Sequence, residues 1–419
     1  MNETFQASTD NQLAVLMLAD GAYYVGASCG ASGEAIGEIS FHTQMIGYPE
    51  VLSDPANAGQ IAVMTYPQIG NYGVARADLE SERGRVRGLV VRDICRTPSN
   101  FRSDLSLPDF LKEQGIVAIS GIDTRALVRY LREHGSMSAI VSTLSTDPVA
   151  LYEKLQVGAE AAAQSNLVAT VSCQDPYLFA PSPEHEPWLQ PLAAPRFKVI
   201  VVDLGVPRSL LNALAKLGAA QIVVPWNTSA AEILAYAPHG VLFSSGPGDP
   251  RNLTEVIQTA QQLLGRLPIL AVGLGHQLLA LAAGGTLEKM KIGHHGANQP
   301  VQHLADGSVT ITEQSHILTV SFDSLGQPLE PAATAGPPTR QNAHWGRIRL
   351  SDRNLNDDTL EGLRYLDSGA LSYQYVPQLL PGAPVPANHP YQVFIQLMQA
   401  VMAAQQVTAS PTQSEVAHA

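Results

Sequence analysis

The stretch ILAVGLGHQLLALA, residues 269–282, decides the fold of the second half of this chain. The apolar run from Ile269 to Val272 predicts a buried strand, and residues 275–283 predict a helix. A strand that enters a helix through small residues turns sharply and forces the residue at the apex into a strained conformation, where enzymes often place a nucleophile. Here the apex residue is Gly273, which has no side chain.

The same alternation of strand and helix continues on the N-terminal side of this turn. Strands are predicted at 197–202, 222–224, 241–243 and 269–272, and helices at 210–217, 230–237, 253–264 and 275–283. Apolar strands that alternate with helices of about ten residues imply a parallel sheet covered on both faces. Residues 196–402 are therefore predicted to form an α/β domain with a mostly parallel, flavodoxin-like sheet.

The first part of the chain has a different pattern. Residues 12–150 predict an α+β domain, with strands at 14–18, 33–41, 59–65 and 88–92 and helices at 109–114 and 123–133. Residues 151–195 are predicted to be an extended connector because several prolines lie close together near its end: Pro181, Pro183, Pro187, Pro191 and Pro195. Residues 333–362 are predicted to be rich in loops.

Composition excludes several classes of function. Of the 419 residues, 45% are hydrophobic and 15% are charged, which is typical of a globular protein with a large core. The net charge of −12 repels phosphate backbones and anionic lipids, so no nucleic-acid or membrane role is expected. A cytoplasmic location is expected for two reasons. The three cysteines, Cys29, Cys95 and Cys173, do not have metal-ligand spacing. The sequence also shows neither a signal-like N-terminus nor an apolar run long enough to span a membrane.

Seven motifs carry a specific resemblance. In the second half they are SSGPGDP (244–250), LGHQLLALA (274–282) and KIGHHGANQPV (291–301). In the first half they are GEISFHTQMIGY (37–48), TYPQIGNYG (65–73), SNFR (99–102) and GIDTR (121–125). Together they resemble the carbamoyl-phosphate synthetase small-subunit family, whose second domain is a class I glutamine amidotransferase. The resemblance covers about residues 12–402.

The resemblance implies a reaction and the residues that perform it. Family members hydrolyse glutamine with a Cys-His-Glu triad and pass ammonia to a large synthetase subunit, which makes carbamoyl phosphate for pyrimidine and arginine biosynthesis. Aligned on the family motifs, the three positions hold Gly273, Val376 and Gln378. Loss of one triad member typically costs about 10⁴-fold in rate or more, so glutaminase activity is expected to be absent.

The resemblance also implies a former glutamine pocket. Its positions here are Gln44, Gly246, Gly248, Leu274, Gln277, Ser315, Ile317 and Leu318. Gly246, Gly248, Leu274 and Gln277 keep the family's residue types, and their retention is interpreted mainly as packing of the turn. Gln44 stands where the family has serine, and Ile317 replaces a glycine, so its side chain is expected to crowd the pocket.

No cofactor is implied, and no metal site is expected. The adjacent histidines His294 and His295 cannot easily share one ion on a strand, and no carboxylate or cysteine joins them at ligand spacing in the sequence.

Three functions are consistent with these observations. The first is a non-catalytic small subunit that stabilises or regulates a large synthetase subunit. The second is a functioning glutaminase with an unrecognised site. The third is a stand-alone binding or scaffold protein, suggested by the unusual sequence of residues 333–380.

Overall fold

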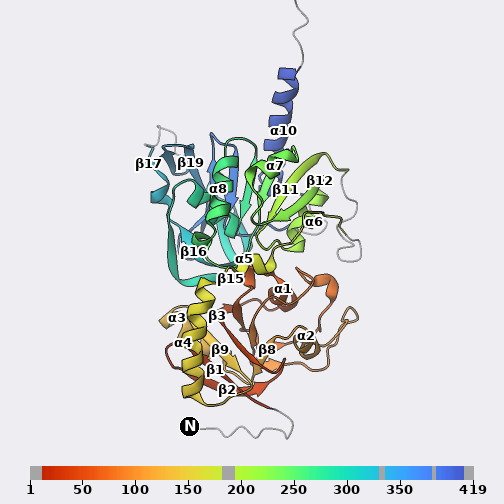
Figure 1. Cartoon of the computed structure of the whole chain (residues 1–419), viewed down its shortest axis with the longest axis vertical. Coiled ribbons are helices and arrows are strands. Elements are labelled where there is room, and N and C mark those ends of the chain that lie inside the picture. Colours follow the sequence, from red (N-terminus) through yellow and green to blue (C-terminus); the bar gives the residue numbers. More distant parts are fainter. Residues whose placement is uncertain (1–11, 182–193, 330–335, 380–383, 410–419) are drawn as a thin grey trace, which may run out of the picture.

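The computed structural model describes residues 12–181, 194–329, 336–379 and 384–409, which form two domains stacked along the long axis of the molecule (Figure 1). The N-terminal domain occupies the lower half of the view and the C-terminal domain the upper half, with helix α10 at the far end. Among the described residues, no helix has the length and apolar character needed to cross a membrane.

The N-terminal domain is built around a closed barrel of seven strands in the order β1-β2-β8-β6-β4-β3-β9. The strands are β1 (Leu13–Leu18), β2 (Tyr23–Ser28), β3 (Glu34–His42), β4 (Gln60–Met64), β6 (Gly88–Val90), β8 (Val117–Ser120) and β9 (Ser138–Ser142). Strands β3, β4, β6 and β8 pair in parallel, and the remaining pairs are antiparallel. Inward side chains such as Leu16, Ile39 and Val63 fill the barrel core.

Within residues 12–181, which the structure describes, five helices occur: α1 (Tyr48–Ser53), α2 (Leu107–Glu113), α3 (Thr124–His134), α4 (Pro148–Gln164) and α5 (Leu167–Val171). Short 3₁₀ turns lie at Pro55–Asn57 and Arg76–Asp78, and β5 (Gln68–Ile69) pairs with β7 (Asp93–Ile94). The side chain of Asp123 caps α3 by accepting from the amide of Ala126, which satisfies one of the free amides at the helix start.

The segment predicted as an extended connector begins as helix. Leu151 and Leu155 of α4 pack against Val15 and Ile140 of the barrel, so this part of residues 151–195 belongs to the N-terminal domain. The prolines at 183, 187 and 191 lie outside the described residues.

The C-terminal domain has a large sheet in the order β10-β12-β11-β13-β14-β21-β20-β19-β15-β16. Its parallel part, from β12 to β21, consists of β11 (Phe197–Asp203), β12 (Ala219–Pro225), β13 (Gly240–Phe243), β14 (Ile269–Val272) and β21 (Ala370–Tyr373). The strands predicted at 197–202, 222–224, 241–243 and 269–272 are all present, so the expected parallel core is confirmed.

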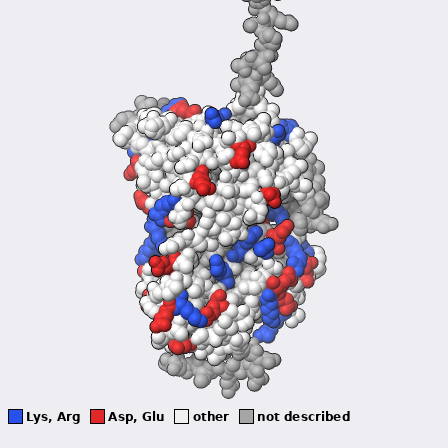
Figure 2. All heavy atoms as spheres, in the orientation of Figure 1, with Lys and Arg blue, Asp and Glu red and all other residues white. Residues whose placement is uncertain are grey.

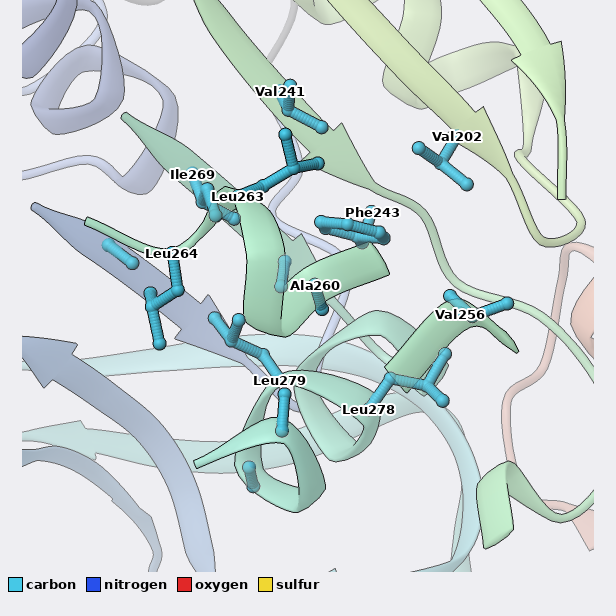
Figure 3. Packing of buried hydrophobic residues seen from close by; sticks show 14 of the residues in the cluster. Val202, Val241, Phe243, Val256, Ala260, Leu263, Leu264, Ile269, Leu278 and Leu279 are labelled. Atoms are coloured by element: carbon cyan, nitrogen blue, oxygen red, sulfur yellow. The ribbon is translucent and has the colours of Figure 1, made fainter. Parts of the chain in front are cut away.

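Helices cover both faces of this core, as predicted. They are α6 (Arg208–Lys216), α7 (Ala230–Ala235), α8 (Thr254–Leu263), α9 (Leu274–Ala282) and α10 (Pro390–Ala409). On one face, Val256 of α8 and Leu278 of α9 pack against Phe243 of β13 (Figure 3). On the other, Leu210 of α6 and Phe394 of α10 belong to the second core cluster. Alternate residues of each strand point to opposite clusters because side chains alternate along a strand.

An antiparallel extension, which the sequence did not predict, continues the sheet beyond β21. It contains β15 (Leu287–His303), β16 (Val309–Val320), β19 (Gly346–Asn354) and β20 (Leu360–Tyr365), with β17 (Gln327–Pro328) and β18 (Thr339–Asn342) beside β19 and a 3₁₀ turn at Phe322–Leu325. At the opposite edge of the sheet, β10 (Tyr177–Leu178) pairs antiparallel with β12, and a further 3₁₀ turn at Pro250–Asn252 precedes α8. The prediction that residues 333–362 are rich in loops is therefore wrong for β18, β19 and the start of β20. Three arginines and Asp352 interrupt the apolar alternation of β19 and obscure its strand pattern.

The surface seen in Figure 2 carries both signs of charge. Lysine and arginine side chains lie interspersed with aspartate and glutamate, and they are more frequent over the N-terminal domain than over the upper part of the C-terminal domain. No continuous basic area of the kind that follows a phosphate backbone lies on this face among the described residues.

Candidate functional site

The turn between β14 and α9, called the elbow below, has Gly273 at its apex. Gly273 adopts φ 54° and ψ −116°, a conformation that glycine accepts readily and other residues adopt only under strain. Its amide donates to the carbonyl of Tyr373 on β21 at 2.9 Å, and its carbonyl accepts from the amide of Gln277. The backbone thus makes the strained turn that the sequence predicted, without a reactive side chain.

The elbow is packed too closely to accept a larger residue freely. A Cβ atom at Gly273 would lie 2.9 Å from the Cβ of Ser245, and one at Gly275 would lie 2.3 Å from the carbonyl oxygen of Phe243. Real Cβ atoms do not approach neighbours this closely without a shift of the structure. Gly275 is therefore explained by packing alone, and Gly273 by packing and backbone conformation together.

Val376 and Gln378, at the positions where the resemblance implies the histidine and the glutamate, both contact Glu313 of β16. Val376 forms an isolated antiparallel bridge with Glu313. Gln378 is exposed, and its Nε2 donates a short hydrogen bond to the Glu313 carboxylate. The backbone of Val376 and the side chain of Gln378 hold the C-terminal segment against β16, and neither side chain is a base or a carboxylate.

A small cavity of about 30 Å³, called the elbow cavity, lies beside Gly273. Its volume is that of about one water molecule. The lining residues are Asp54, Ala56, Glu80, Pro207, Ser209, Ser245, Gly246, Gly273, Leu274, Glu313, Gln314, Ser315, Gln374 and Val376. No cysteine or histidine occurs among these described lining residues, so the elbow cavity contains no thiol and no imidazole.

Three carboxyl groups gather at the elbow cavity, and burial raises the pKa of each. Burial, together with the nearby charges of Asp54 and Glu313, raises the pKa of Glu80 to about 8. Burial raises the pKa of Glu313 to about 7 and that of Asp54 to about 6. Each group keeps one hydrogen bond: Glu80 accepts from the amide of Ser209, Asp54 from that of Ala56, and Glu313 from Gln378.

None of the three cysteines is among the described residues that line the elbow cavity. Burial raises the pKa of Cys29, which packs in the barrel core, to about 12. Burial and the charge of Asp203 raise the pKa of Cys173 to about 12 as well. Both thiols are therefore protonated at neutral pH and poor nucleophiles. Cys95 lies in the N-terminal domain and directs its Sγ to the carbonyl of Thr97.

A larger cavity of about 370 Å³, called the cleft, lies between the two domains. It is lined by seven of the eight positions implied for the former glutamine pocket, namely Gly246, Gly248, Leu274, Gln277, Ser315, Ile317 and Leu318. The structure therefore brings together residues that are widely separated in the sequence. Glu38, Arg87, Asp249, Arg251 and Lys289 give the same cleft charges of both signs.

The eighth position, Gln44, is not among the cleft-lining residues. Its Oε1 accepts from the amide of Ala297 at 2.9 Å, so it ties the N-terminal domain to β15. Gln277 lines the cleft, but its amide donates to the carbonyl of Leu318 at 2.8 Å and to Gln374 at 3.0 Å. The amide groups of both residues are thus used within the chain.

Comparison with known proteins identifies both domains. Residues 16–141 match the family model described as the carbamoyl-phosphate synthase small chain, CPSase domain, and residues 200–343 match glutamine amidotransferase class-I. The carbamoyl phosphate synthase small chain of Syntrophotalea carbinolica is 42% identical over 388 residues, which cover 92% of this chain and 98% of the relative. This chain belongs to the carbamoyl phosphate synthase small chain family.

Other small chains agree. The small chain of Bacillus caldolyticus is 40% identical over 92% of this chain and 96% of its own length. The small chain of Thermosynechococcus vestitus is 42% identical over 92% of this chain and 97% of its own length. The family resemblance inferred from the motifs is thereby confirmed over most of the chain.

Histidines of this small-chain family member contact carboxylates, contrary to expectation. Glu361 of β20 and Asp357 lie 3.3 Å and 3.0 Å from the two ring nitrogens of His294. No carboxylate lies at ligand spacing from His294 and His295 along the sequence, but the strand order β20-β19-β15 brings Glu361 of β20 beside His294 of β15. Only the strand register of residues 346–365 could have shown this.

Proposed function

We propose that this chain is a small subunit that no longer hydrolyses glutamine and that it stabilises or regulates a large subunit of a carbamoyl-phosphate-synthetase-type complex. The observation that carries the proposal is the elbow itself. Its apex residue is a glycine, and the elbow cavity beside it contains no thiol or imidazole among the described residues. Covalent hydrolysis of an amide needs a nucleophile and a base within hydrogen-bond reach.

The intact N-terminal domain supports a role in assembly. The closed barrel and its helices correspond to the family's own small-chain domain, which other class I amidotransferases do not need. Polar contacts such as Gln44 to Ala297 and Asn298 to Thr43 join the two domains and would present them together to a partner.

Two measurements test the proposal. Purified chain incubated with glutamine should release no glutamate above a preparation that lacks the chain. Co-expressed with a large synthetase subunit from the same source, the chain should co-purify with it and raise its ammonia-dependent synthesis or its thermal stability. Clear glutamine turnover, or failure to bind any large subunit, would contradict the proposal.

An active glutaminase with a different nucleophile is the second candidate, and one pair in the cleft favours it. Ser315 Oγ lies 3.3 Å from His295 Nδ1, and both residues line the cleft. However, Ser315 Oγ donates to Asn57 Oδ1 at 2.7 Å, a shorter hydrogen bond than the 3.3 Å contact with His295, so the hydroxyl proton is directed away from the imidazole. Burial and the neighbouring histidines hold the pKa of His295 well below its usual value, which makes it a weak base. A Ser315→Ala variant that lost a measured glutaminase activity would establish this candidate.

The stand-alone scaffold hypothesis has less support. It was suggested by residues 333–380, but β19, β20 and β21 from this region pair within the central sheet. A pulldown from the cell of origin that recovered other partners and no synthetase would favour it.

A further inference from the structure

Three strands bring His294, His316 and Glu361 together inside the C-terminal domain. His294 and His316 are direct partners in the register of β15 and β16, and Glu361 lies on β20. One ligand atom from each residue lies within 4.8 Å of the others, and all three residues are buried. The cluster lies outside the elbow, and His316 also lines the cleft.

The outer ring nitrogens of both histidines are directed at acceptors. His294 Nε2 lies 3.0 Å from the Asp357 carboxylate, and His316 Nδ1 lies 2.9 Å from the carbonyl oxygen of Leu318. In the neutral imidazole each ring carries its single proton at that outer nitrogen, so the inner nitrogen presents a lone pair. Metal-bound histidines are held in this way, by a carboxylate or a carbonyl at the second nitrogen.

The inner nitrogens face oxygen atoms that also accept. Gln314 Oε1 lies 3.1 Å from His294 Nδ1 and 2.9 Å from His316 Nε2. The Gln314 amide is oriented by its Nε2, which donates to Glu361 at 2.9 Å and to Thr312 at 3.1 Å. With each ring proton at the outer nitrogen, two nitrogen lone pairs converge on an oxygen that has no proton to offer.

Glu361 adds a fourth acceptor to this group. Its Oε1 lies 3.3 Å from His294 Nδ1. Among the described residues, one donor approaches the four inner atoms: Asn354 Nδ2, 3.3 Å from His294 Nδ1 and 3.1 Å from Glu361 Oε1. No donor of the described chain approaches His316 Nε2. Such a concentration of buried lone pairs is stabilised by a cation at its centre.

We propose that His294 Nδ1, His316 Nε2, Glu361 Oε1 and Gln314 Oε1 bind one divalent transition-metal ion, with Zn²⁺ the best match. Zn²⁺ takes imidazole nitrogen and carboxylate oxygen at about 2.0–2.2 Å, so neighbouring ligands of a tetrahedral site lie roughly 3.3–3.6 Å apart. Three of the separations, given above, are 2.9–3.3 Å, close to these values, and one ligand atom from each of His294, His316 and Glu361 lies within 4.8 Å of the others. Ca²⁺ and Mg²⁺ fit poorly because they prefer oxygen ligands.

The ion has a structural role in this arrangement. Four protein ligands close the coordination shell and leave no position for substrate, as in structural zinc sites. The ion links β15, β16 and β20 and fixes residues 315–318, which form one wall of the cleft. This inference does not depend on the proposed function, since a zinc-bound chain could assemble with a large subunit or not.

Metal titration of the untagged, EDTA-treated full chain tests the proposal. Zn²⁺ added in competition with a chromophoric chelator should bind at one equivalent per chain, confirmed by elemental analysis after dialysis. Co²⁺ in its place should give the intense visible absorption of a tetrahedral site. Glu361→Gln and His316→Asn should weaken Zn²⁺ binding by about 100-fold or more, and Asp357→Asn, which alters an outer partner, by about 10–100-fold.

The matched control is His303→Asn, which removes a histidine from the same strand where it contacts Asp352 and Thr310. It should leave the stoichiometry at one. A wild-type chain that binds less than about a tenth of an equivalent, or binding unchanged by Glu361→Gln, would overturn the proposal. If the ligand variants fail to fold, the Co²⁺ spectrum of the wild-type chain decides: octahedral or absent absorption rejects the site.

Discussion

Gly273 and Ser245 lie so close that a Cβ atom on the first would stand 2.9 Å from the Cβ of the second. Gly273→Cys should therefore lower the stability of the chain by about 1–3 kcal/mol, from overpacking and from a strained positive φ. It should also leave glutamine hydrolysis undetectable because no histidine is among the described residues that line the elbow cavity. Thermal unfolding and a glutamate-release assay measure the two effects.

A second substitution separates crowding from backbone strain. Ser245→Gly removes the atom that a cysteine would meet, so the double variant Gly273→Cys/Ser245→Gly should recover part of the lost stability and stay inactive. A single cysteine variant as stable as the parent would show that the elbow has more room than the structure indicates.

Gln378→Glu should destabilise the chain above neutral pH. The Gln378 amide donates to Glu313, and a glutamate there would place two carboxylates in contact. Because position 378 is exposed, the cost should be modest, roughly 0.5–1 kcal/mol. Thermal unfolding at pH 8.5 and pH 5.5 measures it, with the smaller effect expected at the lower pH, where Glu313 is protonated. In a chain that also carries Glu313→Gln, the cost of Gln378→Glu should be the same at pH 8.5 and pH 5.5. A pH-dependent cost that persisted in this double variant would show that the repulsion comes from a group other than Glu313.

The carboxyl groups of the elbow cavity predict a pH dependence of stability. The pKa values of Asp54, Glu80 and Glu313 are raised to about 6, 8 and 7, so the folded chain holds these protons more tightly than the unfolded chain. Their contribution is fully present below the unfolded pKa near 4 and is lost as pH rises through about 6 to 8. The melting temperature should therefore fall across this window.

Glu80→Gln should reduce that fall, since glutamine keeps an acceptor for the Ser209 amide and cannot ionise. At pH 8 the variant should melt about 2–4 °C higher than the parent, and at pH 4.5 the two should melt together. The exposed Glu153 on α4 provides the control, and Glu153→Gln should leave the pH profile unchanged. A parent whose melting temperature rises between pH 5 and pH 8 would contradict the prediction.

Glutamine should not bind in the cleft, because Ile317 lines it and the Gln277 amide is already paired. A ligand present at 100 times its dissociation constant stabilises a protein by about 2.7 kcal/mol, which would raise the melting temperature. Because glutamine is not expected to bind, ~10 mM glutamine should leave the melting temperature of the parent chain unchanged. Ile317→Gly should enlarge the cleft and produce a measurable shift. The control is Ile311→Gly, which removes the same side chain from an exposed position of β16 and should produce no shift of the melting temperature with glutamine. A saturable shift in the parent would show that the pocket still functions.

Much of the C-terminal domain was predictable because its signals are local. Each strand of the parallel core is a short apolar run followed by a helix, so β11, β13, β14 and the helices between them appear where the sequence places them. The elbow was also predictable, since strand, glycine and helix are adjacent in the chain. The seven cleft residues were found through the family motifs, which carry spatial information that periodicity does not.

Features that depend on pairing between distant segments were missed. The barrel closes through β1 and β9, which lie more than a hundred residues apart, and nothing local indicates closure. Strand β19 is rich in arginine and exposed on one side, so its pattern resembled a loop. The convergence of His294, His316 and Glu361 follows from the order of strands in the antiparallel extension, which cannot be derived from local sequence patterns.

The crowded contact between Gly273 and Ser245 has an evolutionary consequence. A return to catalysis would need a cysteine at the elbow, a histidine for Val376 and a glutamate for Gln378, and no single step restores turnover. A cysteine at position 273 would crowd the Cβ of Ser245, and a glutamate at position 378 would place its carboxylate against that of Glu313. On the proposed function, neither of these two steps alone gains activity and both lower stability, so selection has nothing to favour until all three residues are in place. The loss of glutaminase activity would then behave as a ratchet, and the chain could be improved for assembly but not readily turned back into an enzyme.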